Sequence, residues 1–386
     1  MGNMSKSLSI IGTRGYPSYY GGFETAVRKL APFFADNGWK VTVYGRKGAT
    51  KHDDPMRDDR IQTVETIGLE SKSLSTLTFG LTSVVHSLVN KPDVALIMNV
   101  ANGFWLPLLK MRGVPTVVNV DGIEWERAKW GALAKFVFKM GARLTARFGT
   151  VLVSDSIEIQ RRWKEEFGRD STFIPYGGET PGKYDVVPGL ESGTYVLMVA
   201  RFVPENTIAE FLTAAEQIAV NHPVVIVGST GYGGELDEMA KTLSVGSPNV
   251  TWLGHVSDDK KLFSLWQHAG VYFHGHSVGG TNPALVQAMA CGAPVIARFT
   301  PYNLEVLTVE DHLVPAEPAA IEQAIRHMLT NPEVRKAASV FNESRARESY
   351  NWRDVCRDYE ETIAGAKLLK IKPLALDAKS DVQNAD

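Results

Sequence analysis

Short apolar runs separated by longer amphipathic stretches recur along the chain. The first run, residues 8–12, leads through a glycine-rich loop into a helical stretch over 23–37 and a second apolar run over 40–44. Such an alternation predicts parallel strands that are buried on both faces and joined by helices. Three more runs of this kind follow at 94–98, 116–120 and 151–153. The N-terminal half therefore predicts one α/β domain.

The same alternation restarts in the second half, with apolar runs at 195–199, 224–227, 250–253, 271–273 and 295–297. A stretch rich in proline and glycine at 174–190 has the composition of a hinge between the two halves. We predict an N-terminal Rossmann-like domain over 1–180, a C-terminal one over 181–365 and a disordered tail over 366–386. Because ligands of such sheets bind at the carboxyl ends of the strands, we expect a site in a cleft between two facing sheets.

Composition narrows the class of protein. Hydrophobic residues make up 44% of the chain and charged residues 22%, with a net charge of -2, which fits a globular protein and gives no reason to expect nucleic-acid binding. The two cysteines, Cys291 and Cys356, fall in helical stretches and form no disulfide framework or CxxC site. The first nine residues lack a secretory signal, and no run of about 18 apolar residues occurs. We therefore expect a cytoplasmic protein.

The loop after the first predicted strand is a candidate phosphate site. It ends in Gly21 and Gly22 directly before a helix, where backbone amides and the helix dipole favour an anion. The alternative is that these glycines only shape a tight turn. The second predicted strand ends in Tyr44-Gly-Arg46, without the acidic residue that an NAD site uses. An NADP site that reads Arg46 is a remote alternative.

Several longer motifs carry a specific resemblance. They are the stretch 12–46, the segment DGIEWERAKW at 121–130, ARFVPEN at 200–206, WLGHVS at 252–257, and SVGGTNP at 277–283 with QAMACG at 287–292. In this order they resemble the rhamnosyltransferase-type branch of the family 4 glycosyltransferases, over about residues 8–365. The resemblance implies a GT-B fold, in which two Rossmann-like domains with parallel sheets face each other across a cleft.

The resemblance also implies the activity. A hexosyltransferase of this kind moves a hexose or deoxyhexose from a nucleoside-diphosphate sugar, here a dTDP- or UDP-sugar with dTDP-rhamnose favoured, to a saccharide or lipid-linked saccharide. The implied setting is cell-surface polysaccharide synthesis, and the implied outcome is retention of the anomeric configuration. The nucleotide sugar is a co-substrate, and no further cofactor is expected.

Arg201 is the expected catalytic cation. The leaving diphosphate carries negative charge, and an arginine just past a strand can bind it with two parallel hydrogen bonds. The alternative is a surface arginine in a salt bridge. The resemblance implies a lysine five residues later, but this chain has Asn206 there. The donor clamp is therefore expected to hold one positive charge instead of two.

A glycine-rich loop precedes another predicted helix and is expected to bind the donor diphosphate or sugar. It consists of Gly279, Gly280, Thr281 and Asn282. Many members of the family carry glutamates at the positions of 279 and 287, of which the second accepts hydrogen bonds from the ribose, whereas this chain has Gly279 and Gln287. Glycine at 279 resembles a habit of the rhamnosyltransferase-type branch, but glutamine at 287 is less expected. Glutamine still hydrogen-bonds a hydroxyl, but more weakly than a carboxylate does.

Asp121 is the expected catalytic carboxylate of the N-terminal domain. It follows a predicted strand, so it can bind or deprotonate an acceptor hydroxyl, or else it caps the next helix. Glu24 and Glu124 are expected beside the acceptor, and Asn303 and Glu305 beside the donor sugar. Capping and surface charge are the alternatives for these four residues.

Two histidines and one turn complete the predicted donor site. His274 and His276 flank a glycine at a strand end, but no third ligand and no DxD motif accompany them, so we expect no metal ion. We instead expect His276 to hydrogen-bond the diphosphate or sugar. The turn that contains Gly254 and Val256 resembles the base-recognition turn of the family, which acts through backbone groups.

A basic and aromatic stretch, residues 127–147, suggests a second contact. It carries six Lys or Arg residues without an acidic residue, interleaved with Trp130, Phe136 and Phe138. Such a helix can lie on an anionic membrane and bring the enzyme to a lipid-linked acceptor. The alternative is a helix that packs its apolar side on its own sheet.

Two other functions remain open from sequence. One is a non-catalytic GT-B scaffold in a glycan-assembly complex, which Asn206, Gly279 and Gln287 favour. The other is a nucleotide-sugar 2-epimerase, which would need acidic and basic groups around its UDP-sugar that the loop 279–283 does not supply.

Overall fold

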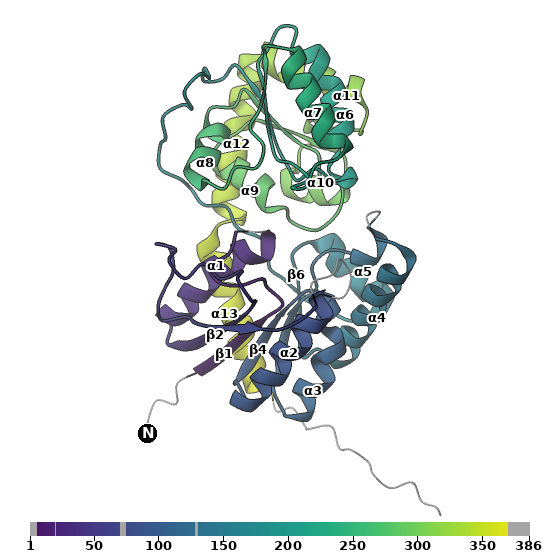
Figure 1. Ribbon diagram of the computed structural model, residues 1–386. Helices are drawn as coiled ribbons and strands as arrows, with labels where there is room; N and C mark the ends of the chain where they lie inside the picture. Colours follow the sequence, from purple (N-terminus) through teal and green to yellow (C-terminus); the bar gives the residue numbers. More distant parts are fainter. Residues whose placement is uncertain (1–5, 20, 70–74, 128–129, 370–386) are drawn as a thin grey trace, which may run out of the picture.

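The computed structural model describes residues 6–19, 21–69, 75–127 and 130–369, and these residues form two α/β domains (Figure 1). A seven-stranded parallel sheet with the order β3-β2-β1-β4-β5-β6-β7 forms the first domain. Its elements are β1 (Lys6–Ile11), α1 (Gly22–Asp36), β2 (Trp39–Arg46), β3 (Gln62–Thr66), α2 (Ser75–Asn90), β4 (Val94–Met98), η1 (Val100–Trp105), α3 (Leu106–Met111), β5 (Thr116–Asn119), η2 (Glu124–Glu126), α4 (Ala132–Phe148), β6 (Val151–Ser154), α5 (Ile157–Phe167) and β7 (Thr172–Phe173).

The second domain is built on a six-stranded parallel sheet with the order β10-β9-β8-β11-β12-β13. Its elements are β8 (Val196–Val199), η3 (Pro204–Asn206), α6 (Ile208–Ile218), β9 (Val224–Val227), α7 (Glu235–Gly246), β10 (Val250–Trp252), α8 (Asp259–Gln267), β11 (Val271–His274), α9 (Pro283–Ala290), β12 (Val295–Arg298), α10 (Pro301–Leu307), η4 (Glu310–His312), β13 (Leu313–Val314), α11 (Pro318–Thr330) and α12 (Pro332–Ser349). Together the two sheets confirm the predicted fold class.

Alternation along each strand divides the core of the first domain into two layers. In β4, Leu96 and Met98 pack in the cluster that contains the apolar face of α1, whereas Ala95 and Ile97 pack with residues of α2, α3 and α4 on the opposite face. Successive side chains of a strand point to opposite faces, so a strand buried on both faces has to be apolar at every position. For this reason central strands such as β4 read as continuous apolar runs in the sequence, whereas β3, with the sequence QTVET, does not.

Each sheet reverses its strand order at one point. The reversal lies between β1 and β4 in the first domain and between β8 and β11 in the second. At such a point the loops that follow the two strands run to opposite faces and leave a crevice at the carboxyl ends. The loops after β1, β8 and β11 contain most of the predicted site residues.

The last helix, α13 (Trp352–Leu368), returns to the first domain. Tyr359 Oη accepts a hydrogen bond from Asn119 Nδ2 at 2.7 Å, and Glu360 Oε1 accepts one from Trp39 Nε1 at 3.2 Å. The predicted second domain, 181–365, thus ends in a helix that packs on the first sheet. The predicted tail begins inside α13, and its residues 370–386 lie outside the described part of the chain. In the described part, α13 and the other helices are all too short or too polar to cross a membrane.

Candidate active site at the domain junction

Loops from both domains meet where the two sheets present their carboxyl ends (Figure 1). A Cβ added to Gly122, after β5, would lie 2.9 Å from the Cα of Gly279, after β11. A Cβ added to Gly22, at the start of α1, would lie 3.4 Å from Pro283 Cγ, at the start of α9. The N-termini of α1 and α9 therefore adjoin each other. Gly21 and Gly22 stand at the start of α1, and Gly279 and Gly280 lie in the loop before α9.

The loop before α9 is fixed to the first domain through Asp155, the residue after β6. The backbone N–H and the hydroxyl of Thr281 both donate to the Asp155 carbonyl oxygen, the former at 3.1 Å. A Cβ at Gly280 would lie 2.0 Å from Asp155 Oδ1, so only glycine fits there. Asn282 caps α9 by accepting from Ala284 N at 2.9 Å. The side chains of Thr281 and Asn282 thus shape the loop, and the backbone N–H of Thr281 is already paired with Asp155.

The loop before α1 is held by its own glutamate. Glu24 is buried, and its Oε1 accepts from Arg14 N at 3.0 Å and from Thr13 Oγ1 at 3.4 Å. Gly21 is the extended residue directly before the helix. Glu24 therefore orders the loop around the helix N-terminus, which is the capping type of role that the sequence left open for it.

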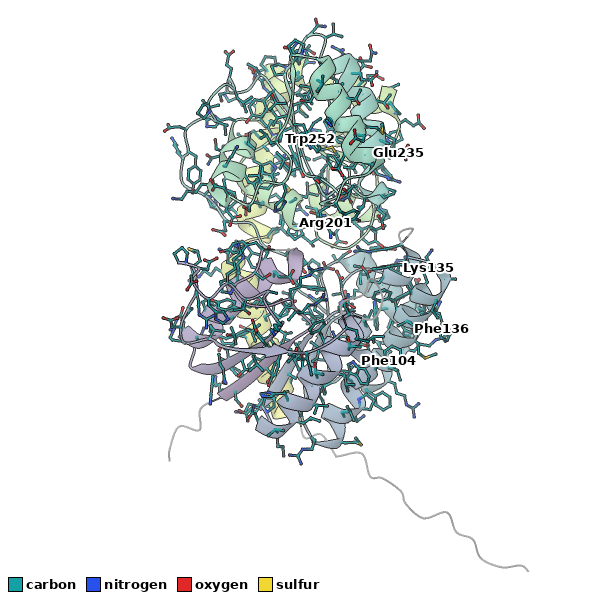
Figure 2. All side chains as sticks on the ribbon, viewed as in Figure 1. Phe104, Lys135, Phe136, Arg201, Glu235 and Trp252 are labelled. Carbon is teal, nitrogen blue, oxygen red and sulfur yellow. The ribbon has the colours of Figure 1, made fainter. Side chains whose placement is uncertain are left out.

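Arg201 follows β8 and is exposed at the edge of the second domain that faces the first (Figure 2). Asn206 is buried, and its Nδ2 donates to the Arg201 carbonyl oxygen at 2.8 Å. Asn206 consequently fixes the turn that carries Arg201.

His276 lies close to Arg201. Its ring stacks on His274 with centroids 4.5 Å apart, and its Nδ1 is buried without a hydrogen-bond partner among the described residues. Burial, with Arg201 and Arg127 nearby, lowers the pKa of His276 to about 3. The ring is therefore neutral at physiological pH, with one nitrogen able to donate and one able to accept a hydrogen bond.

Asp121 has a left-handed backbone, with φ of 55°, although it is not glycine. Its N–H donates to Asn119 Oδ1 at 2.8 Å, which supports this conformation. Burial is the main cause that raises the pKa of Tyr176 and of Asp155, and in both cases the charge of Asp121 is the next. Non-glycine residues in this region are often held there by the surrounding structure at functional sites. The structure thus places the predicted acceptor carboxylate at the junction, beside Asp155 and Tyr176.

Glu124 begins η2 and is buried. Its Oε1 lies 2.6 Å from Arg127 Nε, and its Oε2 accepts from Trp130 Nε1 at 2.9 Å. Both carboxylate oxygens therefore have partners within the segment that follows β5.

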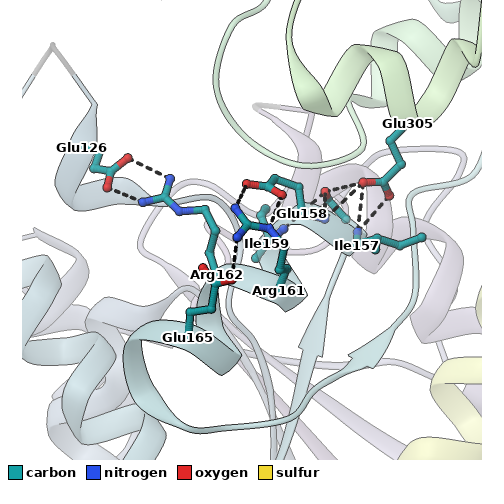
Figure 3. Close-up of polar contacts among 9 residues, drawn as sticks. Glu126, Ile157, Glu158, Ile159, Arg161, Arg162, Glu165 and Glu305 are labelled. Carbon is teal, nitrogen blue, oxygen red and sulfur yellow. Dashed lines mark hydrogen bonds and ion pairs between the residues drawn. The ribbon is translucent and has the colours of Figure 1, made fainter.

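Glu305 caps a helix of the other domain, and its predicted place near the donor sugar stays a prediction (Figure 3). It accepts from Ser156 Oγ at 2.8 Å and from Ile157 N at 2.9 and 3.0 Å, at the start of α5. Asn303 is buried and donates to the carbonyl oxygens of His276 at 2.9 Å and Arg298 at 2.8 Å. Both side chains fit the structural alternatives that the sequence left open for them.

Gln287 and the turn after β10 also engage backbone groups. The Gln287 amide pairs with the backbone of Glu179 in the linker. Gly254, with φ of 62°, accepts from Gly228 N at 2.7 Å, and Val256 packs at the edge of the core. The predicted ribose and base contacts at these three positions stay predictions.

Two buried carboxylic acids at the junction were not predicted. Asp155 Oδ1 and both carboxylate oxygens of Glu205 are buried and lack hydrogen-bond partners among the described residues. The available signal for Asp155 was its place two residues after the apolar run 151–153, which is close to the signal that identified Asp121 directly after its run. Glu205 carried no such signal, because it sits one turn beyond the strand end in η3.

Comparison with protein families agrees with this architecture. Residues 186–345 match the family described as glycosyl transferases group 1, and residues 5–179 match the family described as a domain of unknown function (DUF1972). An uncharacterized glycosyltransferase of Methanocaldococcus jannaschii is 22% identical over 163 residues. That match spans 41% of this chain and only 40% of the relative.

Solved structures show the same fold along nearly the whole chain. Sucrose-phosphate synthase from Thermosynechococcus elongatus superposes with a TM-score of 0.78 at 19% identity, over 93% of this chain and 98% of that one. Anabaena HepE in complex with UDP-glucose superposes with a TM-score of 0.72 at 15% identity, over 93% and 99%. The chain therefore has the GT-B fold, and its residues 186–345 match the family described as glycosyl transferases group 1.

Proposed function

We propose that this protein is a retaining glycosyltransferase that moves a hexose or deoxyhexose from a nucleoside-diphosphate sugar to a saccharide or lipid-linked saccharide. The observation that carries the proposal is the junction of the group 1 domain with the first domain. There the glycine-rich loop before α9 lies against Gly22 and Gly122, with Arg201 at the facing edge. Two adjoining helix N-termini, with a guanidinium on the domain edge that faces the first domain, are features that suit a diphosphate.

In this proposal Arg201 and the backbone amides before α9 stabilise the charge that develops on the leaving diphosphate, without a metal ion. His276 is neutral and adjacent, so it can hydrogen-bond a phosphate or a sugar hydroxyl. HepE in complex with UDP-glucose has the same fold, which favours a pyrimidine nucleotide. The sequence resemblance favours dTDP-rhamnose among such donors.

Asp121 is the proposed acceptor residue. Its carboxylate comes from the opposite domain to Arg201, so acceptor and donor would meet between them. As a carboxylate at the end of a buried strand, it can orient an acceptor hydroxyl and accept its proton.

The proposed acceptor is lipid-linked because α4 has an apolar surface. Leu133 is 77% exposed and Phe136 61% exposed, and the same helix carries Lys135, Arg143 and Arg147. Figure 2 labels Lys135 and Phe136 on this helix. Arg127 is not part of this surface, since it lies at the domain junction with Glu124. We therefore propose that the exposed side of α4 contacts the inner face of the membrane, where the lipid-linked acceptor for cell-surface polysaccharide synthesis lies.

Calorimetric titration with dTDP, UDP and GDP in the presence of EDTA tests the proposal. We expect one nucleotide to bind and Arg201→Ala to weaken it about 10- to 100-fold, the range for a hydrogen-bonded charge pair. The control is Arg335→Ala, which removes an arginine of α12 that donates to the Gly193 carbonyl oxygen within the second domain. Failure of all three nucleotides to bind would instead favour a non-catalytic scaffold. Product analysis with the bound nucleotide's sugars then separates transfer from 2-epimerisation.

A further inference from the structure

Arg127 brings a second guanidinium to the junction from the first domain. Its Nε lies 2.6 Å from Glu124 Oε1, and its side chain is only 15% exposed. Its Nη2 would lie 3.4 Å from a Cβ at Gly122 and 3.7 Å from a Cβ at Gly279. The guanidinium therefore sits at the contact between the loop after β5 and the glycine-rich loop of the second domain.

Arg201 and Arg127 both lower the pKa of His276. After burial, Arg201 and then Arg127 are the causes that lower the pKa of His276. His276 lies two residues beyond the end of β11, and the two guanidiniums that lower its pKa come from opposite domains. This agrees with the distances from Arg127 to the glycine loop that follows the same strand.

Asn206 does not supply the second positive charge that the sequence resemblance leads one to expect. It is buried and neutral, and its amide holds the Arg201 carbonyl oxygen. A guanidinium at Arg127 supplies that charge from the other wall. The ion pair with Glu124 is formed at Nε and lacks hydrogen-bond geometry, and in this proposal the two Nη groups of Arg127 donate to another anion.

We propose that Arg127 binds the donor diphosphate opposite Arg201, so that the clamp has one cation from each domain. This inference rests on the proposed function. Glu124 acts as a positioning residue that aims the guanidinium at the Gly279 loop, and it is not an acceptor ligand. A nucleoside diphosphate would then also hold the two domains together, because each contributes one of its cations.

Calorimetry with paired nucleotides tests the role of Arg127 separately from nucleotide binding itself. Wild type, Arg127→Ala and Arg127→Lys are titrated with UDP and UMP, and with dTDP and dTMP. The control is Arg162→Ala, which removes an arginine paired with Glu126 in the same region. We expect Arg127→Ala to weaken the diphosphates about 10- to 100-fold and the monophosphates less than about 3-fold. Arg127→Lys should retain an intermediate affinity because it keeps the charge without the fork.

The outcomes distinguish the inference from the proposed function. Wild-type binding that Arg127→Ala leaves unchanged, or an equal loss for di- and monophosphates, overturns the inference alone. No binding by wild type overturns the proposed function as well. If Arg127→Ala unfolds because Glu124 is left buried and unpaired, the double variant Arg127→Gln with Glu124→Gln removes both charges, and the same selective loss of the diphosphates is expected.

Discussion

The side-chain amide of Gln287 pairs with the backbone of Glu179 as one peptide pairs with another. Gln287 Oε1 accepts from Glu179 N at 2.9 Å, and Gln287 Nε2 donates to Glu179 O at 2.8 Å. The pair joins α9 to the linker between the domains. A glutamate at this position could accept the first hydrogen bond but, when ionised, could not donate the second. This gives a structural reason for glutamine where the sequence resemblance implies glutamate.

Gln287→Glu should therefore destabilise the protein at neutral pH. It places a carboxylate against the Glu179 carbonyl oxygen, and we expect a loss of about 1–3 kcal/mol in the free energy of unfolding. Thermal denaturation at pH 7 measures this loss, with Gln217→Glu on an exposed position of α6 as the matched control. Unchanged stability together with tighter nucleotide binding would contradict the linker role and place the ribose at this position.

Glu305 should stabilise the contact between the domains. Its carboxylate caps the first turn of α5 across the junction, where an anion is favoured by the helix dipole. We expect Glu305→Gln to cost about 1–2 kcal/mol and to speed amide hydrogen exchange at residues 157–159. The control is Glu310→Gln, an exposed glutamate of the same domain. Protection of the first turn of α5 that stays as in wild type would argue against a cross-domain cap.

The central strands and the general place of the candidate site could be predicted because each depends on local sequence, whereas the short or polar strands β3, β7 and β13 were not predicted. Continuous apolar runs indicate buried parallel strands. Because ligands of parallel sheets bind at the carboxyl ends of the strands, Asp121, Arg201 and Gly279 were predicted to lie at one junction. The roles of Glu305 and Gln287 could not be predicted, since their partners lie 148 and 108 residues away in sequence. Such contacts depend on how the two domains dock, and the periodicity of apolar residues along the chain does not predict that arrangement. The position of α13 could not be predicted either, because its apolar face does not indicate which of the two sheets it covers.

Asp155 should make stability fall as pH rises. Burial, and next the charge of Asp121, raises its pKa well above the ordinary value. The folded protein then binds more protons than the unfolded chain at any pH between about 3.9 and the folded pKa, so the free energy of unfolding decreases across this range. Asp155→Asn removes the titrating group. We expect this variant to match wild type near pH 4 and to exceed it at pH 7–8.

Urea denaturation of both proteins at several pH values measures this difference. Asp170→Asn, at an exposed aspartate that follows α5, controls for a general change in charge. Parallel pH profiles for wild type and Asp155→Asn would show that Asp155 titrates normally in the folded protein.

The exposed side of α4 should bind anionic vesicles. Leu133 and Phe136 are the exposed apolar side chains, and Arg143 and Arg147 are exposed on the same helix, so apolar insertion and electrostatic attraction would act together. We expect wild type to sediment with vesicles that contain phosphatidylglycerol and less so in high salt. Leu133→Asp with Phe136→Asp should reduce binding at least about 10-fold, because each buried apolar side chain contributes about 1.5–3 kcal/mol.

The matched control is Tyr232→Asp with Val245→Asp, which changes two exposed apolar residues of the second domain. Equal binding by both double variants would mean that another surface meets the membrane, and no binding by wild type would remove α4 from the proposed contact with a lipid-linked acceptor.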